Sequence, residues 1–325
     1  MEIVCPAGTP AALRAAVKAG AHTVYCGFAD ETNARNFPGL NFDREEMQEG
    51  VRFAHSHGAK VLVAINTFPR AGAEDIWHRA VGDAETAGAD AVILADLGLL
   101  AHTAEKHPNL RRHLSVQAAA ANADVINFYA DTFGVKRVVL PRVLSVPEIA
   151  AINAETEVET EVFVFGGLCV MAEGRCSLSS YATGKSPNMN GVCSPPSHVE
   201  YREDGSDLDA RLGGYVIHRV GKGEPAPYPT LCKGCFSAET KTGHLFEDPV
   251  SLNAEQLMPQ LKKAGVTALK IEGRQRSRSY VAQVVKNFRA ATDALEAGLP
   301  MPEGMLARLS EGQAVTTGAY KKTWR

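Results

Sequence analysis

The sequence predicts a (β/α)8 barrel interrupted by one loop-rich insert. Short β-rich runs alternate with stretches of helical periodicity, which is typical of βαβ units around a parallel sheet. Eight such units are present, and the 325 residues of the chain exceed the about 250 that such a barrel needs. The alternative fold is an open doubly wound sheet. The sequence lacks the glycine-rich phosphate-binding turns of such nucleotide-binding sheets, so the barrel is favoured.

The eight expected strands are short and bounded by turn-forming residues. They cover residues 2–5, 22–27, 60–66, 91–96, 114–117, 137–142, 160–167 and 268–273. The first seven follow one another at helix-length intervals. The eighth comes only after a long interruption, which separates it from the rest of the expected barrel.

Helical stretches separate these strands and show recognisable boundary signals. An alanine-rich helix ends at Gly20, where glycine favours termination. The next helix begins at Asp43, with Glu46 three residues later as in a capping box. Further helices are expected at residues 75–88, 124–133, from 145 onward, 253–265 and 279–299.

The interruption differs from the barrel in composition. Residues 169–252 are dense in glycine, proline and other turn formers, whereas residues 1–168 and 253–300 form the expected barrel and 301–325 a C-terminal extension. A small hairpin is expected from residues 198–202 and 214–220. So long an irregular insert requires something to hold it, and a bound metal would do so.

Charge and targeting signals narrow the class of protein. The chain has 34 basic and 37 acidic side chains, a net charge of −3, which does not predict a nucleic-acid surface. The N-terminal sequence lacks the features of a secretory signal, and no uncharged run approaches the about 20 residues of a membrane helix. We therefore expect a cytoplasmic protein without a transmembrane segment.

The cysteines are the strongest chemical signal. Five of the seven fall in the insert, at Cys169, Cys176, Cys193, Cys232 and Cys235. In a reducing compartment such a group indicates metal binding or catalysis rather than disulfides. Four thiolates can hold a zinc ion or a cubane iron–sulfur cluster, and this spacing does not decide between them. Unliganded buried thiols are the alternative interpretation.

Two further cysteine features have simpler explanations. Cys232-Lys-Gly-Cys235 has the spacing of a redox pair but lacks the surrounding residues of a thioredoxin-type motif. Cys5 and Cys26 lie in expected barrel strands, where thiols usually pack as small apolar groups.

A substrate pocket is expected at the C-terminal ends of the strands, where barrel enzymes place their sites. Planar guanidinium groups there would suit a dicarboxylate, since each can bind a carboxylate through two hydrogen bonds. The polar residues at these ends are Tyr25, Asn66, Asp96, Gln117, Arg142, Lys270, Glu272 and Arg274, followed by Arg276 and Arg278.

Each of these polar residues also has a structural interpretation. Asp96 could cap the helix that follows it. Asn66 and Gln117 could satisfy neighbouring backbone groups, and Arg276 and Arg278 could simply be solvated. Arg142 and Arg274 are the stronger candidates for substrate binding, with Glu272, Asn66 and Gln117 beside them.

Several segments resemble one protein family. The matching segments are Glu2-Ile-Val-Cys-Pro-Ala-Gly, Thr32-Asn-Ala-Arg, Ala64-Ile-Asn-Thr-Phe, Val138-Val-Leu-Pro-Arg-Val-Leu-Ser, Phe165-Gly-Gly-Leu-Cys, Glu173-Gly-Arg-Cys, Tyr228-Pro-Thr-Leu-Cys-Lys-Gly and Lys270-Ile-Glu-Gly-Arg-Gln-Arg-Ser. On these motifs, which run from residue 1 to about 295, the chain is similar to the collagenase-like peptidase family, in its branch for oxygen-independent ubiquinone biosynthesis.

The resemblance implies a function. It implies a [4Fe-4S] protein that hydroxylates prenylated phenol intermediates of ubiquinone biosynthesis without dioxygen, together with a homologous UbiV-type subunit. Prephenate is then the expected oxygen donor, and a lipid-carrier protein is an expected partner because prenylated phenols are insoluble. The resemblance leaves the catalytic residues unidentified.

The resemblance also implies the cluster ligands. The motifs assign Cys169, Cys176, Cys193 and Cys232, while Cys235 stands where the family usually has another residue and could replace Cys232. Two other functions compete. A peptidase-like hydrolase is disfavoured because His-Glu-x-x-His and Gly-x-Ser-x-Gly motifs are absent. A non-catalytic scaffold subunit, in which a metal only holds the insert, is the second.

Overall fold

The computed structural model describes residues 1–190, 193–221, 223–224, 226–302, 304, 306, 309 and 314–321. Eight parallel strands form a closed barrel in the order β14-β1-β2-β3-β4-β5-β6-β7, and β14 closes it by pairing with β7. The predicted fold class is therefore confirmed. The barrel strands are β1 (Glu2–Pro6), β2 (Thr23–Cys26), β3 (Lys60–Ile65), β4 (Ala91–Leu94), β5 (Arg112–Leu114), β6 (Val135–Val139), β7 (Glu159–Gly167) and β14 (Ala268–Ile271).

Helices surround the barrel, and most of them begin at a residue whose side chain caps the first turn. Asp43 and Glu46 form the predicted capping box of α2, and Ser145 forms another with Glu148 at the start of α6. The helices around the barrel are α1 (Pro10–Lys18), α2 (Arg44–Ser56), α3 (Asp75–Thr86), α4 (Leu97–Lys106), α5 (Ala123–Phe133), α6 (Val146–Ala154), α9 (Met258–Lys263) and α10 (Arg278–Glu296). Among the described residues, no helix is both long and apolar enough to cross a bilayer.

Two predicted strands are displaced along the chain. β5 ends at Leu114, because Ser115 caps a short 3-10 turn by accepting a hydrogen bond from the backbone of Gln117 (3.3 Å). β6 begins two residues earlier than predicted, directly after Gly134, whose positive φ ends α5. It ends before Pro141, which has no backbone N–H to donate to a ladder.

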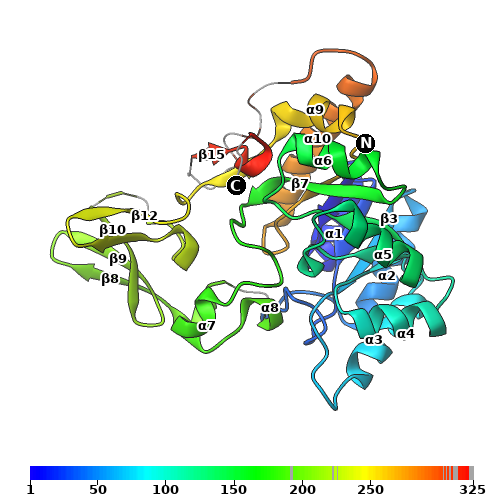
Figure 1. The fold of residues 1–325 in the computed structure, drawn as a ribbon, viewed down its shortest axis with the longest axis horizontal. Coiled ribbons are helices and arrows are strands. Elements are labelled where there is room, and N and C mark those ends of the chain that lie inside the picture. The colour runs from blue at the N-terminus through cyan, green and yellow to red at the C-terminus, as the bar shows by residue number, and fades with distance from the viewer. Residues whose placement is uncertain are drawn as a thin grey trace.

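The insert contains more strand than predicted. The expected hairpin is wrong in one respect, because β9 (Asp207–Leu212) lies between β8 (Val199–Asp204) and β10 (Tyr215–Gly221) and pairs with both. A second hairpin joins β11 (Cys235–Ala238) to β12 (Lys241–His244). Two short helices, α7 (Leu178–Thr183) and α8 (Pro187–Asn190), precede these sheets. Figure 1 shows strands β8 to β12 standing away from the barrel.

The chain returns to the barrel at the end of the insert. The predicted helix at 253–265 is shorter, since β13 (Ser251–Asn253) pairs antiparallel with β7 and a 3-10 turn separates it from α9. β15 (Val315–Thr316) then pairs with β13. The described part of the C-terminal extension therefore lies on the barrel sheet, and Figure 1 shows it between the barrel and the insert.

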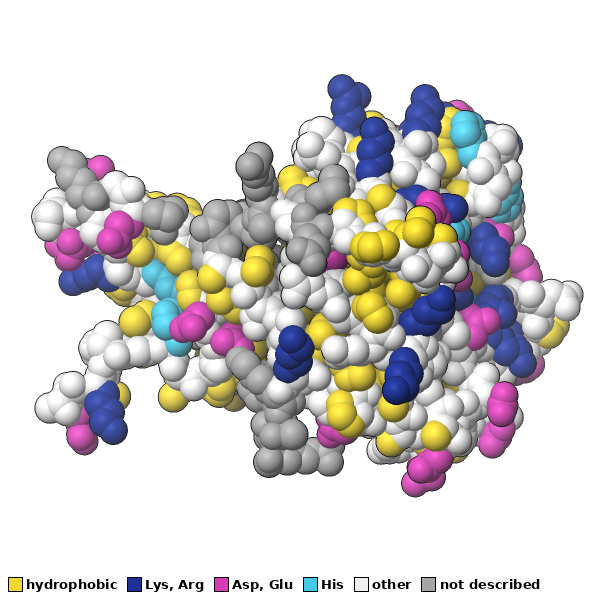
Figure 2. All heavy atoms as spheres, turned by 90° about the horizontal axis from the view of Figure 1, so that it is seen from above, with side chains coloured by type: hydrophobic (Ala, Val, Ile, Leu, Met, Phe, Trp, Pro, Cys, Tyr) yellow, Lys and Arg dark blue, Asp and Glu magenta, His cyan; other side chains and the backbone are white. Residues whose placement is uncertain are grey.

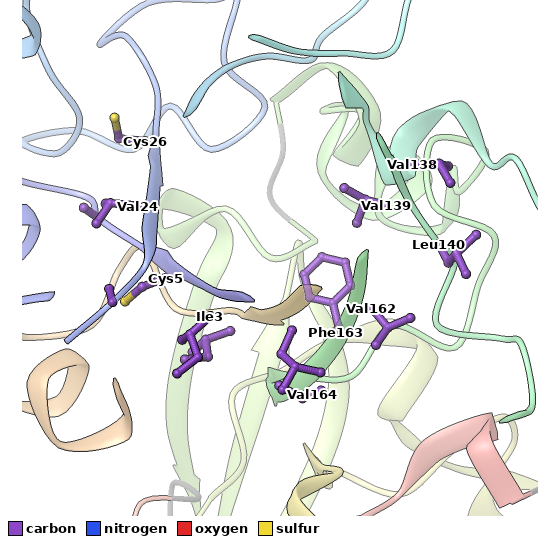
Figure 3. Close-up of a cluster of buried hydrophobic side chains, with 14 of the residues drawn as sticks. Ile3, Cys5, Val24, Cys26, Val138, Val139, Leu140, Val162, Phe163 and Val164 are labelled. Atoms are coloured by element: carbon purple, nitrogen blue, oxygen red, sulfur yellow. The ribbon is translucent and has the colours of Figure 1, made fainter. Parts of the chain in front are cut away.

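The core fills the space between the barrel strands and the surrounding helices. Ile3, Val24 and Val164 are fully buried in it, and Figure 3 shows these side chains with the thiols of Cys5 and Cys26. Burial raises the pKa of the Cys26 thiol to about 12 and that of Cys5 further. Both cysteines are thus packed core thiols, as the sequence predicted.

Candidate functional site

A cavity of about 620 Å³ lies at the C-terminal ends of the barrel strands. Its floor consists of side chains that point into the barrel from six strands, namely Tyr25, Ala64, Ile93, Val139, Phe163 and Lys270. Its walls come from the segments that follow the strands and from the insert, including residues 115–117, 166–169 and 272–276. This is the position at which barrels of this kind bind their substrates.

Four of the insert cysteines line this cavity together. They are Cys169, Cys176, Cys193 and Cys232, which are spread over 64 residues of sequence. Cys235 does not line it. That residue lies on β11, where it pairs with His244 of β12. The structure thus brings together the four cysteines that the family motifs assigned and places the fifth outside the cavity.

The four thiols influence one another electrostatically. Burial, together with the charges of Cys193 and Cys176, raises the pKa of Cys232 to about 11. Burial likewise raises the pKa of Cys169 to about 12, with contributions from Glu173 and Cys193. Four thiolates near one another are unfavourable unless a cation neutralises them, which is what a bound metal centre does.

Four thiols around one cavity are a donor set that could hold a single ion or a cubane cluster. Zinc holds its sulfur ligands about 2.3 Å from one point, which requires the donors to converge closely. Within the described part of the chain, no three His, Cys, Asp or Glu side chains are arranged to hold one metal ion. A cubane has four iron corners and binds one thiolate at each, so its ligands lie further apart. The four cysteines would hold such a group.

Arg142 is largely engaged by the protein. Its Nε donates to Oε1 of Glu173 at 2.8 Å, and its Nη1 donates to the carbonyl of Gly167 at 2.6 Å and to Oε2 of Glu272 at 2.9 Å. Its guanidinium also lies 4.0 Å from the centroid of the Phe163 ring. Three of its five donors are therefore used. Arg142 ties the segment after β6 to the segments after β7 and β14.

Arg274 is buried without such partners. Its side chain is 7% exposed, and Nη1 donates to Oδ1 of Asn33 at 2.8 Å. Within the described residues it forms no ion pair with a carboxylate, and burial lowers its pKa to about 10. None of its other nitrogens is both fully buried and without a hydrogen-bond partner. Because Arg274 lines the cavity, its remaining donors are available to an anionic ligand there.

The charge of the cavity lining favours anions. Two carboxylates line it, those of Glu173 and Glu272. Against them stand six cationic side chains, those of Arg35, Arg142, Lys233, Lys270, Arg274 and Arg276. The formal excess is four positive charges. Four thiolates would offset all of it, and a bound metal centre would in turn offset thiolate charge and restore a positive balance. An anionic group of a substrate is therefore attracted to this cavity.

Glu173 is a site residue that reasoning from the sequence did not identify. It is buried, and burial raises its pKa, while its Oε2 has no hydrogen-bond partner among the described residues. The following residue, Gly174, has a φ of +75°, and a Cβ there would lie 1.9 Å from the carbonyl oxygen of Gln117. Only glycine allows this approach. The Glu173-Gly-Arg-Cys motif was the available signal.

Asn66 and Gln117 both line the cavity, as predicted. Asn66 also has a structural part, because its Oδ1 accepts a hydrogen bond from the backbone N–H of Ala34 at 3.1 Å and its Nδ2 lies 3.5 Å from Oγ of Ser115. Gln117 is buried in the 3-10 turn after β5. The two amides therefore lie on the same side of the barrel mouth.

Of the remaining polar candidates, one lines the cavity and two do not. Asp96 caps α4 by accepting a hydrogen bond from the backbone of Leu99 at 2.8 Å, and it does not line the cavity. Its structural interpretation is confirmed. Arg276 lines the cavity, whereas Arg278 is exposed at the start of α10 and does not.

Comparison with known proteins places the chain in a family. The model of peptidase family U32 matches residues 8–316. The tRNA hydroxylation protein P of Escherichia coli is 33% identical over 338 residues, which cover 96% of this chain and 72% of that protein. A 23S rRNA 5-hydroxycytidine synthase of the same organism is 30% identical over 316 residues, covering 96% of this chain and 42% of that protein.

A solved structure agrees with the fold. The structure of the U32 peptidase Mk0906 matches with a TM-score of 0.50 at 15% identity, over 85% of this chain and 94% of that chain. At this identity the likeness concerns the fold alone. The extent of the family match and the identity to the relatives together establish that this chain belongs to peptidase family U32.

Proposed function

We propose that this chain is the UbiU-type, [4Fe-4S]-bearing subunit of an oxygen-independent hydroxylase. It acts with a homologous UbiV-type subunit on prenylated phenol intermediates of ubiquinone biosynthesis, and prephenate donates the oxygen. The observation that carries the proposal is that four cysteines and Arg274, which has no ion pair among the described residues, line the same cavity at the barrel mouth. On this proposal, a metal centre and an anion site adjoin one space.

Hydroxylation is supported by the relatives. One relative is named as a tRNA hydroxylation protein, and another is named as the synthase of a hydroxylated cytidine in 23S rRNA. The peptidase name of the family suggests hydrolysis instead, but the sequence has neither the zinc-protease nor the serine-hydrolase motif. A four-iron cluster, when bound, offers electron transfer beside the substrate.

The anion site supports a dicarboxylate donor. Arg274 presents unused guanidinium donors to the cavity, and a carboxylate can accept two of them in parallel. The overall exchange balances as Ar–H + R–OH → Ar–OH + R–H. The ring carbon is oxidised by two electrons, and the donor carbon is reduced by two.

An RNA base is the second candidate substrate, because the names of the relatives concern RNA. The net charge of −3 does not favour it. Basic and acidic side chains are interspersed over the face drawn in Figure 2. The apolar part of the cavity floor, formed by Ile93, Val139 and Phe163, would accept an aromatic ring of either kind.

Anaerobic reconstitution tests the proposal. The chain and its homologous partner, purified without oxygen, are supplied with a prenylated phenol, with or without prephenate, and the product is analysed by mass spectrometry. We expect conversion only with both proteins and prephenate. A parallel incubation with unmodified tRNA tests the second candidate: hydroxylated tRNA and no hydroxylated phenol would favour the RNA substrate.

Metal analysis of the same preparation tests the cluster. We expect about four irons and four sulfides per chain. Stoichiometric zinc would overturn the cluster assignment. Conversion by the partner alone would instead favour the scaffold interpretation, in which this chain has no catalytic part.

A further inference from the structure

Lys270 is a buried cation at the floor of the cavity whose role the proposed function does not explain. It lies on β14, is 5% exposed, and its Nζ is 2.5 Å from Oε1 of Glu161 on β7. The same Nζ lies 3.8 Å from the centroid of the Tyr25 ring. An ammonium group has three donors, and the contact with Glu161 uses one. Since Lys270 lines the cavity, a ligand on the floor would meet this group.

The surroundings of Lys270 are apolar apart from a few charges. The rest of the floor is formed by Ala64, Ile93, Val139 and Phe163, with the ring of Tyr25 against the lysine. The hydroxyl of Tyr25 donates to the carbonyl of Ile271 at 2.9 Å and is therefore directed at the backbone. A flat aromatic ring would bury apolar area on this floor, and a polar substituent of the ring could reach the ammonium group of Lys270.

The charged and titratable groups that act on Lys270 come from several strands. They are Glu161 on β7, Arg137 on β6, Arg274 after β14 and His113 on β5. The carboxylate of Glu161 is shared, because Arg137 also contacts it at 3.4 Å. Arg137 is also paired with Glu2 and Glu159, so its charge is neutralised there. Lys270 therefore has one ion-pair contact among the described residues, with Glu161, and its other two donors can bind an anionic ligand.

We propose that Lys270 binds the phenolic oxygen of the ring substrate and stabilises it as a phenolate, with Glu161 as the positioning residue. The phenolic proton passes to solvent as the substrate binds. A phenolate is more electron-rich than the phenol, so its ring carbons accept an oxygen more readily. Arg274 would hold the carboxylate of the donor beside it. The inference rests on the proposed function for the identity of the substrate, but its test does not require turnover.

The test measures the ionisation of a bound phenol. The probe is 4-fluorophenol, added to the anaerobically purified chain, and its fluorine resonance is followed by NMR as a function of pH. In the wild-type protein we expect the pKa of the bound probe to lie at least about one unit below that of the free probe. A wild-type protein that binds the probe without this shift, or does not bind it, overturns the proposal.

Two variants assign the shift to the lysine. Lys270→Met alone would leave Glu161 buried beside only Arg137, so the double variant Lys270→Met with Glu161→Gln removes both charges and preserves the packing. We expect the shift to be lost in the double variant and retained in Lys263→Met, whose lysine is exposed on α9. An equal shift in the double variant overturns the proposal, provided that circular dichroism shows it to be folded.

The outcome is separable from that of the proposed function. If the bound probe ionises as expected but no prenylated phenol is hydroxylated, the Lys270 site stands and the assigned reaction fails. If hydroxylation proceeds but the double variant lowers the pKa of the bound probe as much as the wild type does, the reaction stands and the role of Lys270 fails.

Discussion

At the scale of single residues, the two arginines favoured by the sequence have different environments. Arg142 gives three hydrogen bonds to the protein, two of them to carboxylates, whereas Arg274 has one bond to an amide. Both are buried and both line the cavity. A buried guanidinium without a carboxylate is costly unless a ligand supplies the negative charge. We therefore expect Arg274 to be the anion anchor, whereas Arg142 holds the loops that shape the cavity.

Replacing Arg274 tests this division. We expect Arg274→Gln to weaken the binding of prephenate about tenfold to a hundredfold, because a charge-assisted hydrogen bond contributes about 1.5–3 kcal/mol. Isothermal titration calorimetry under anaerobic conditions measures the change. Arg278→Gln, at the exposed start of α10, is the matched control and should bind as the wild type does. Unchanged affinity in Arg274→Gln would exclude it as the anchor.

Cys232 and Cys235 can be distinguished in the same way. Cys232 lines the cavity with three other cysteines, and Cys235 does not. We therefore expect Cys232→Ala to lose most of its iron and sulfide, while Cys235→Ala retains about four of each per chain. Iron and sulfide analysis after anaerobic purification measures both. The reverse result would assign the fourth ligand to Cys235.

At the scale of elements, the insert forms its own small sheets beside the barrel. The sheet β10-β9-β8 buries Ala210, Leu212 and Ile217, while β8 is mostly exposed. Its core is small, so single buried polar groups matter for its stability. The sequence predicted strands here only in part, because the β9 segment Asp207–Leu212 carries two aspartates and an arginine among its six residues.

The buried His218 makes this sheet sensitive to acid. It lies on β10, its Nε2 has no hydrogen-bond partner among the described residues, and burial lowers its pKa from 6.5 to about 4, with a further contribution from His244. Between about pH 4 and pH 6.5, His218 therefore binds a proton in the unfolded chain but not in the folded sheet. The stabilisation is complete above pH 6.5 and is lost as the pH falls toward 4.

We expect the insert to lose about 1 kcal/mol of stability between pH 7.5 and pH 5.5. Hydrogen exchange of the amides in β9 and β10 at the two pH values measures this loss. His218→Phe keeps an aromatic ring and removes the titration, so its exchange free energies should change much less with pH. An identical pH dependence in this variant would assign the effect to other groups.

At the scale of the whole molecule, ionic contacts tie the barrel together at its N-terminal mouth. Arg137 on β6 contacts Glu2 on β1 at 2.5 Å and Glu159 on β7 at 2.7 Å, and Glu161 lies on the other side of it at 3.4 Å. β1 and β6 are not neighbours in the sheet, so this contact spans the barrel. A cavity of about 240 Å³ at this mouth is lined by these paired charges. Such a network belongs to the stability of the fold rather than to its chemistry.

Truncating Arg137 should therefore affect the entire barrel. We expect Arg137→Met to lower the free energy of unfolding by about 3 kcal/mol, because it leaves Glu2 without its ion-pair partner and the fully buried Glu161 with Lys270 alone. Urea denaturation followed by circular dichroism measures the loss. Arg111→Met removes a more exposed contact with Glu159 and should cost less than about 1 kcal/mol. Equal losses in both variants would contradict the special role of Arg137.

The sequence by itself determined the barrel, the starts of most helices and the grouping of the cysteines. Hydrophobic periodicity and capping are local, so they can be read from neighbouring residues. Only the tertiary structure decided which cysteines share a cavity and which arginine lacks a carboxylate. Arg142 and Glu272 are 130 residues apart, and Cys232 and Cys235 only three. Their roles depend on which side chains the closed barrel and its insert bring together, and local sequence patterns do not specify these contacts.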